Sequence, residues 1–116
     1  MMFTINFYTQ IYEDMLLKGR KTATIRLGDK SSKYIAGELV WITVGNRFGR
    51  RRKLFTAIID SAIVKRIADV SPREIDRESP EMRTHEDLIT FLSRIYDRPV
   101  GMEDLVTVVH FSPVTE

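Results

Sequence analysis

The sequence predicts an α+β fold: one domain spanning residues 1–116, with a mainly antiparallel, barrel-like sheet and flanking helices. Three observations favour this class. The length of 116 residues is near the commonest size of a single domain. The composition, 43% hydrophobic and 29% charged, is that of a globular protein. Along the chain the patterns run strand, helix, strand, loop, hairpin, helix, strand, with no repeat or linker dividing them.

The first two predicted elements are short. Residues 3–7 alternate apolar and polar side chains, which predicts a strand. The segment TQIYEDMLLKG then places apolar residues at helical spacing, and it is bounded by Thr9, a candidate N-terminal cap, and by Gly19, a candidate left-handed stop. We therefore expect one short helix, whose apolar positions are Ile11, Met15 and Leu16.

The stretch KTATIRL, residues 21–27, predicts a strand with two unlike faces. It is rich in β-branched residues and alternates. Ala23 and Ile25 share one face, and Thr22, Thr24 and Arg26 share the other.

The second half of the chain continues with a polar loop, a strand and a long partner strand. ELVWITVG (38–45) predicts a strand in which Trp41 belongs to the core. LFTAIIDSAIVKRI (54–67) is long enough to require a bend or bulge. Together they predict a hairpin whose tip carries the basic sequence RFGRRRK (47–53).

The remaining elements are a short helical turn after the first Ser-Pro pair, a longer helix and a closing strand. Thr84 and Asp87 have the spacing of a capping box, and the apolar residues that follow recur at i, i+3, i+4 and i+7. We expect a helix over residues 85–96. The apolar run in EDLVTVVHF (103–111) predicts a strand that is buried on both faces.

The composition excludes several kinds of chemistry. The chain has no cysteine, so disulfides, thiolate catalysis and cysteine-ligated metal sites are excluded. His85 and His110 are 25 positions apart, and we expect neither a metal nor a cofactor.

No apolar run approaches the roughly 18 residues that would span a bilayer. The opening residues lack the basic start and apolar stretch of a secretory signal, so we expect a cytoplasmic protein without membrane contacts.

The charges are distributed unevenly behind a net charge of +2. Residues 18–53 contain eleven Lys and Arg against two acids, whereas residues 69–87 contain seven acids against three arginines. Such polarity can steer a phosphorylated partner to one side of a molecule. Alternatively, the two segments face each other or the solvent.

The strand at 21–27 is the first candidate for a functional site. Lys21, Thr22, Thr24 and Arg26 would concentrate hydroxyl groups and positive charge, an arrangement that suits a phosphate, a carboxylate or a nucleobase carbonyl. Alternatively, the threonines are solvent-side strand residues and Arg26 pairs with a surface acid. The pattern alone favours this second interpretation.

A resemblance to a known family changes that balance. The line YEDMLLKGRKTATIR, followed by a polar loop and AGELVWIT, resembles the signature of the ASCH domain, the activating signal cointegrator homology domain of the PUA-like superfamily. The counterparts of its motif are the run from Gly19 through Arg20 and Lys21 to Thr22, then Arg26, with Gly37 and Glu38 in place of the usual Gly-Asp. The resemblance extends more weakly through the later helix and the final strand.

The resemblance implies a PUA-like β-barrel with a cleft, along the Lys-Thr strand, for RNA or a nucleotide-like ligand. The chain is also similar to small ASCH proteins that act as amidohydrolases on acetylated cytidine nucleosides. The resemblance implies Lys21 and Thr24 as two of their three catalytic residues. For the third, a glutamate, Glu81 has the spacing that the family pattern suggests, seven residues before Leu88, and Glu78 competes with it.

The amidohydrolase chemistry makes a demand on Lys21. A threonine hydroxyl is a poor nucleophile until a base removes its proton, and a lysine with a reference pKa of about 10.4 is almost wholly protonated at neutral pH. To act as the base, Lys21 needs its pKa lowered by roughly three units, about 4 kcal/mol, through burial or a neighbouring cation such as Arg20 or Arg26. A nearby glutamate opposes that shift, so its role would be to orient substrate or shuttle a proton.

The basic tip of the predicted hairpin is the second candidate. Its five cations can neutralise phosphates while Phe48 stacks on an exposed base. Alternatively, the charges protect a sheet edge. The cations are Arg47, Arg50, Arg51, Arg52 and Lys53.

Three functions follow from these features. The first is binding of RNA or a modified nucleoside by a monomer, at a cleft formed by Lys21, Thr22, Thr24 and Arg26, with the basic tip as an auxiliary phosphate contact. The second is an amidohydrolase that removes an acyl group from an acetylated cytidine-type nucleoside through Lys21, Thr24 and Glu81. The third is an interaction module whose basic hairpin binds an acidic protein partner.

Overall fold

A single curved sheet of five strands organises the molecule. The computed structural model describes residues 3–8, 11–46 and 49–115, and for residue 11 it describes the backbone alone. The strands are β1 (Phe3–Phe7), β2 (Ala23–Leu27), β3 (Leu39–Gly45), β4 (Arg51–Arg66) and β5 (Leu105–Pro113). The helices are α1 (Ile11–Leu17), α2 (Pro72–Glu78) and α3 (His85–Tyr96), with a 3₁₀ turn at Ile67–Asp69.

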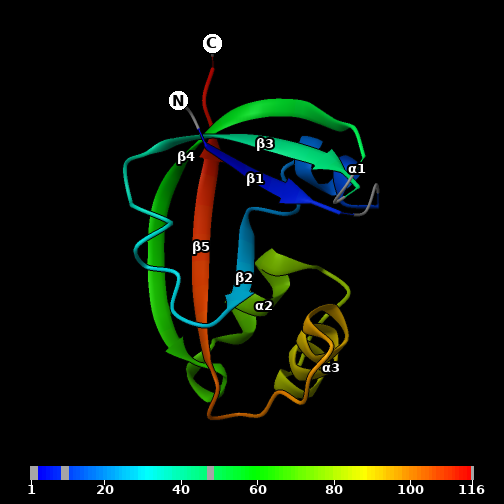
Figure 1. The fold of residues 1–116 in the computed structure, drawn as a ribbon, viewed down its shortest axis with the longest axis vertical. Coiled ribbons are helices and arrows are strands. Elements are labelled where there is room, and N and C mark those ends of the chain that lie inside the picture. The colour runs from blue at the N-terminus through cyan, green and yellow to red at the C-terminus, as the bar shows by residue number, and fades with distance from the viewer. Residues whose placement is uncertain (1–2, 9–10, 47–48, 116) are drawn as a thin grey trace.

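The strand order in the sheet is β1-β3-β4-β5-β2. β1 lies parallel to β3 and the other three pairs are antiparallel, which confirms the mainly antiparallel prediction. The sheet curls into a half-barrel, and α2 and α3 lie together at one end of the molecule (Figure 1). The α+β class and the barrel-like sheet are therefore confirmed.

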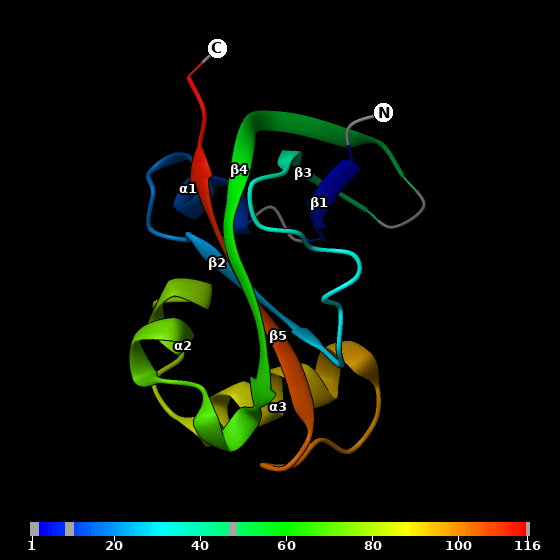
Figure 2. The ribbon, with the colours of Figure 1, turned by 90° about the vertical axis from the view of Figure 1, so that its left-hand side faces the viewer.

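The predicted bend of the long strand is present in β4. The pairing register of β4 with β5 shifts between Ile59 and Ser61, and that of β3 with β4 shifts between Ile42 and Thr43. Extra residues in one strand of a pair increase the local bend and twist. Figure 2 shows β4 arching across the sheet, so that its two ends contribute to opposite ends of the molecule.

The helix ends follow their local sequence signals. After α1, the amide of Arg20 donates to the carbonyl of Met15 (2.8 Å) and that of Gly19 to Leu16 (3.3 Å), while Gly19 takes a φ of 72°. This is a Schellman motif, which glycine makes accessible. α3 has the predicted bounds and the predicted capping box between Thr84 and Asp87. Thr9, the expected cap of α1, lies outside the described residues.

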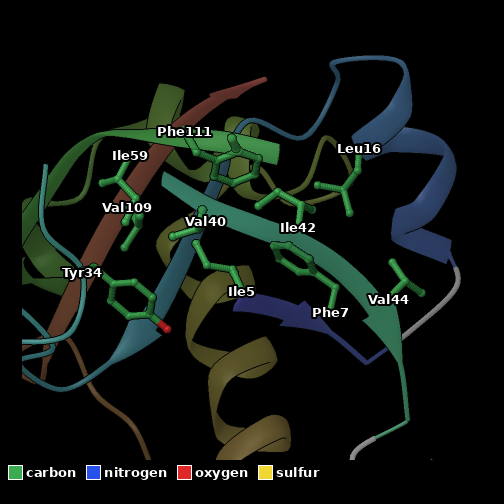
Figure 3. Close-up of a cluster of buried hydrophobic side chains, with 11 residues drawn as sticks. Ile5, Phe7, Leu16, Tyr34, Val40, Ile42, Val44, Ile59, Val109 and Phe111 are labelled. Atoms are coloured by element: carbon green, nitrogen blue, oxygen red, sulfur yellow. The ribbon is translucent and has the colours of Figure 1, made fainter. Parts of the chain in front are cut away.

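Two hydrophobic clusters lie on opposite faces of β5. Val109 and Phe111 belong to the cluster inside the half-barrel, which Figure 3 shows together with β1, β3 and α1. Val106 and Val108 belong to a second cluster, which packs β5 and β2 against α2 and α3. β5 is thus buried on both faces, as its apolar run predicted.

The prediction that Trp41 belongs to the core is wrong. Val40 and Ile42 point into the half-barrel, so alternation along β3 turns Trp41 to the outer face, where it is 40% exposed. The ammonium group of Lys53 lies 5.0 Å from the centre of the indole ring. This contact covers part of the ring.

The described residues contain no helix long and apolar enough to cross a membrane. Over the same residues, no three His, Asp or Glu side chains gather in a way that could hold a metal ion.

Candidate functional site

The candidate site lies where the two edges of the curved sheet approach each other. β1 and β2 are the terminal strands of the sheet, and the guanidinium of Arg26 on β2 donates to the backbone carbonyl of Asn6 on β1 (Nη2–O 3.4 Å). A cavity of about 620 Å³ opens at this seam. We call it the seam cavity; its lining residues are Asn6, Phe7, Tyr8, Tyr12, Thr24, Ile25, Arg26, Glu78, Phe91, Ile95 and Tyr96.

Lys21 lies buried beside this cavity, at 1% exposure. The Schellman turn after α1 sets its position, and its own amide donates to the carbonyl of Met15 (3.1 Å). The ammonium Nζ has three acceptors: the carbonyl of Ala23 at 2.8 Å, the carbonyl of Glu78 at 2.6 Å and Oε1 of Glu78 at 2.5 Å. All three N–H donors of an ammonium group are therefore accounted for.

Glu78 is the last residue of α2 and is 2% exposed. Its Oε1 binds Lys21, and its Oε2 accepts a hydrogen bond from the amide of Ile25 at 2.6 Å. β2 is an edge strand, whose outward N–H and C=O groups have no neighbouring strand to bind. The Lys21–Glu78 pair supplies those partners, since it binds the carbonyl of Ala23 and the amide of Ile25.

Tyr96, the last residue of α3, covers the same edge further along. Its hydroxyl accepts a hydrogen bond from the amide of Leu27 (3.2 Å). The edge of β2 is thus closed by side chains from α2 and α3 rather than by another strand, which leaves room for a cavity between β2 and β1.

The environment of Lys21 acts on its pKa in opposing directions. Burial is the largest influence and lowers the pKa, the positive charge of Arg26 lowers it further, and the charge and hydrogen bond of Glu78 raise it. The net direction is downward. This is the direction that a base at this position needs, and Glu78 opposes it, as the sequence led us to expect.

Aromatic rings surround the ammonium group of Lys21. Its Nζ lies 4.8 Å from the centre of the Tyr12 ring and 5.0 Å from that of Phe7, within the range of cation–π attraction. Burial raises the pKa of Tyr12, and the negative charges of Glu78 and Glu81 raise it further. Tyr12 therefore presents a protonated phenol to the cavity at neutral pH.

Thr24 and Arg26 form the polar wall of the seam cavity. The hydroxyl Oγ1 of Thr24 accepts a hydrogen bond from Nε of Arg26 at 2.9 Å. The guanidinium of Arg26 lies 5.5 Å from the centre of the Phe7 ring. Because Arg26 fills an acceptor position on the Thr24 oxygen, the hydroxyl proton is left to donate elsewhere.

The structure brings some of the residues predicted for this site together and places others elsewhere. It brings together Lys21, Thr24 and Arg26, but Thr22, which precedes β2, lines a different cavity, and Arg20 is exposed. The carboxylate paired with Lys21 is that of Glu78. Glu81, which the spacing favoured, lies beyond Pro80 and is exposed, and its negative charge raises the pKa of Tyr12.

Arg52, on the strand that leaves the basic tip, contacts α1. Arg50, Arg51 and Arg52 are exposed, and the guanidinium of Arg52 pairs with the carboxylate of Glu13, the neighbour of the cavity residue Tyr12. This pair brings the strand that leaves the tip close to one wall of the seam cavity. Arg47 and Phe48, also predicted to bind nucleic acid, lie outside the described residues.

Several lining residues were not singled out from the sequence. Asn6, Tyr8, Tyr12 and Tyr96 lie at or near the ends of elements, which sequence patterns place only approximately, and Phe91 is one of the apolar residues whose spacing predicts the helix at 85–96. The one available signal was the number of aromatic residues near both predicted helices, which does not reveal that they converge.

Comparison with known proteins identifies the fold. No family model matches the sequence, and no curated protein matches it. The structure is similar to the crystal structure of an ASCH domain from Lactobacillus crispatus JV V101, at 20% identity and a TM-score of 0.69, covering 97% of this chain and 79% of the other.

Two further solved structures share the fold. One is a protein of Enterococcus faecalis V583 assigned to the family DUF984, at 16% identity and a TM-score of 0.74, with 98% of this chain and 81% of the other covered. The other is a hypothetical protein designated PH0355, at 15% identity and a TM-score of 0.66, with 98% and 100% covered. At these identities the likeness concerns the fold.

Proposed function

We propose that this chain, which has the fold of an ASCH domain, binds a nucleoside unit of RNA or a free modified nucleoside in its seam cavity. One observation carries the proposal: a cavity of about 620 Å³ combines aromatic walls with a few fixed polar groups. Its volume falls within the roughly 300–1,000 Å³ that is usual for small-molecule sites.

The lining suits a flat, polar heterocycle. Five aromatic side chains, Phe7, Tyr8, Tyr12, Phe91 and Tyr96, offer surfaces on which a base stacks. Thr24 and Arg26 offer hydrogen-bond donors for a ring nitrogen or carbonyl oxygen. The Lys21–Glu78 pair holds the edge of β2, and with it Thr24, in place.

The test is an NMR titration of the whole chain with cytidine, with N4-acetylcytidine and with a short single-stranded RNA. We expect saturable shifts at the amides of Asn6, Tyr8, Thr24 and Arg26. Thr24→Val keeps the side-chain shape and removes the hydroxyl, and it should weaken binding by about tenfold, the value of one or two hydrogen bonds to a ligand.

The matched control is Thr90→Val, on the exposed face of α3, which should leave the affinity unchanged. If all three ligands leave the cavity residues unshifted, the proposal is wrong, and the interaction-module hypothesis for the basic hairpin gains support.

A second candidate function, removal of an acyl group from an acetylated cytidine-type nucleoside, has its own supporting observation. Lys21 and Glu78 form a buried pair that is hydrogen-bonded to β2, the strand that carries Thr24. In such a reaction the Thr24 oxygen would attack the acyl carbon, its proton would pass to a base, the amine would leave with a proton, and water would then hydrolyse the acyl-threonine ester.

The contacts of Lys21 make binding the better supported function. Its Nζ donates to three acceptors, so it has no lone pair to accept the Thr24 proton until one of its own protons moves to Glu78. Assay of acetate release from N4-acetylcytidine separates the two functions. An amidohydrolase loses this activity in both Thr24→Val and Glu78→Gln and keeps it in Glu81→Gln.

A further inference from the structure

A second cavity lies next to β2 and α2. It has a volume of about 400 Å³ and is lined by Thr22, Arg73, Glu74, Arg77 and His110. We call it the α2 cavity. Arg73 and Arg77 are four residues apart on α2, so their side chains lie on the same face, one turn apart.

The two arginines are the distinctive feature of this cavity. Both are exposed, and within the described residues neither guanidinium is joined to a carboxylate. Two guanidinium groups one helical turn apart repel each other unless an anion lies between them. Their planar N–H donors match the oxygen spacing of a phosphate group.

Among the described residues, Glu74 is the one acid that lines this cavity, and its carboxylate is already engaged. Both carboxylate oxygens of Glu74 lie 3.1 Å from Nζ of Lys65, and Oε1 also accepts the amide of Ser71 at 2.8 Å. Burial raises the pKa of Glu74, but the bonds from Ser71 and Lys65 outweigh it and lower the pKa overall. Lys65 therefore balances Glu74, and the cavity keeps the charge of its arginines.

The other lining residues, Thr22 and His110, add further polar groups. The backbone of Thr22 is fixed on both sides, since its amide donates to the carbonyl of Arg77 (3.2 Å) and its carbonyl accepts from Phe111 (3.1 Å). Its hydroxyl has no hydrogen bond within the described residues. His110 on β5 is partly exposed and places Nε2 3.9 Å from Oε2 of Glu74.

From this arrangement we propose that the α2 cavity binds a phosphate group. The guanidinium groups of Arg73 and Arg77 hold its oxygens, and the Thr22 hydroxyl and the His110 imidazole complete the contacts. The phosphate is either inorganic phosphate or that of a nucleotide. Arg77 precedes Glu78 of the seam cavity, and Thr22 lies two residues before Thr24, so neighbouring residues of the chain line the two cavities.

The test is an NMR titration of the whole chain with inorganic phosphate at constant ionic strength, with chloride as the reference salt. We expect saturable shifts at the amides of Thr22, Arg77 and His110. The double variant Arg73→Gln/Arg77→Gln keeps side-chain length and helix propensity, and its affinity should fall by at least about tenfold. Arg94→Gln, an exposed arginine in the last turn of α3, should bind phosphate as the parent does.

Each outcome supports or overturns the proposal. No saturable shift at these residues, or equal shifts in the double variant, overturns it. Repeating the titration with cytidine and with cytidine 5′-monophosphate identifies the source. Tighter binding of the monophosphate than of phosphate, with shifts at Thr24 as well, identifies a nucleotide, and equal affinity identifies free phosphate. Because phosphate alone tests the α2 cavity, this result does not depend on nucleoside binding in the seam cavity.

Discussion

At the scale of single residues, Lys21 and Glu78 solve a problem that an edge strand creates. The carbonyl of Ala23 and the amide of Ile25 face away from β5 and would otherwise be buried without partners. The ion pair binds both groups, and each of its own charges is satisfied in turn. A buried pair of this kind contributes little net stability compared with apolar residues, but removing one member leaves the other as an uncompensated buried charge.

We therefore expect Lys21→Met to lower the free energy of unfolding by about 3–5 kcal/mol. Glu78 would keep its charge and lose its counterion. Urea denaturation measures this change. Lys18→Met is the matched control, since Lys18 is exposed and its pair with Asp14 is worth at most about 1 kcal/mol.

The double variant Lys21→Met/Glu78→Gln tests whether the unpaired charge of Glu78 causes the loss of stability. A glutamine oxygen still accepts the amide of Ile25 and carries no charge, so the double variant should be more stable than Lys21→Met alone. If Lys21→Met costs no more than Lys18→Met, the ion pair does not hold the edge of β2 in place.

The sequence pattern groups three residues that the structure also brings together, and it leaves the choice of carboxylate open for a physical reason. Thr24 and Arg26 lie on β2 and Lys21 lies two residues before it, so a local pattern brings the three together. The choice between Glu78 and Glu81 depends on where α2 ends. The helix stops at Glu78 before Ser79 and Pro80, which directs that carboxylate at β2. Glu78 and Glu81 are only three residues apart in the sequence, and their spacing from the next helix does not show where α2 ends.

At the scale of elements, local signals proved more informative than pairing between strands. The bounds of α3 were predicted correctly because its capping box and apolar spacing lie within the helix. β4 begins at Arg51, three residues earlier than expected, because its partner strand β3 sets where pairing starts. The outward position of Trp41 has the same origin, since the inner face of β3 is chosen by the whole half-barrel.

The capping box of α3 predicts a pH dependence of stability. Oδ2 of Asp87 accepts the amides of Arg83 (2.9 Å) and Thr84 (3.1 Å), and these bonds, that from Arg83 first, lower its pKa below the ordinary 3.8. A carboxyl group with a lowered folded-state pKa stabilises the fold above pH 3.8. This contribution is lost as the pH falls through the folded-state pKa.

Thermal melts of the parent and of Asp87→Asn, from neutral pH to below pH 3.8, test this expectation. The difference in melting temperature should be largest at neutral pH and should shrink as the pH falls below 3.8. Glu86→Gln, in the same turn of the helix, controls for the loss of a negative charge near its N-terminus. A difference that stays constant with pH would show that the Asp87 carboxylate has no special role.

At the scale of the whole molecule, three cationic features lie in or beside the two cavities. Arg26 lies in the seam cavity, Arg77 lies in the α2 cavity, and Arg52 joins the strand after the basic tip to α1 beside Tyr12. These residues come from three separate elements, so no local pattern predicts where they lie relative to the two cavities. The uneven charge along the chain hinted at it without giving the geometry.

If the ligand is RNA, this arrangement predicts a salt dependence. For single strands the slope of log affinity against log salt concentration is about −0.7 for each phosphate that the protein neutralises. The triple variant Arg50→Gln/Arg51→Gln/Arg52→Gln should therefore make the slope shallower by about 0.7 for each phosphate that it no longer neutralises, and should weaken binding at low salt. Fluorescence anisotropy with a labelled short RNA at several salt concentrations measures both quantities.

Arg66→Gln is the matched control, because Arg66 is the exposed last residue of the same strand, where it pairs with Asp69 and Glu103. A slope equally steep in the parent and in the triple variant would exclude the basic tip from RNA binding and leave the seam and α2 cavities as the proposed binding surface.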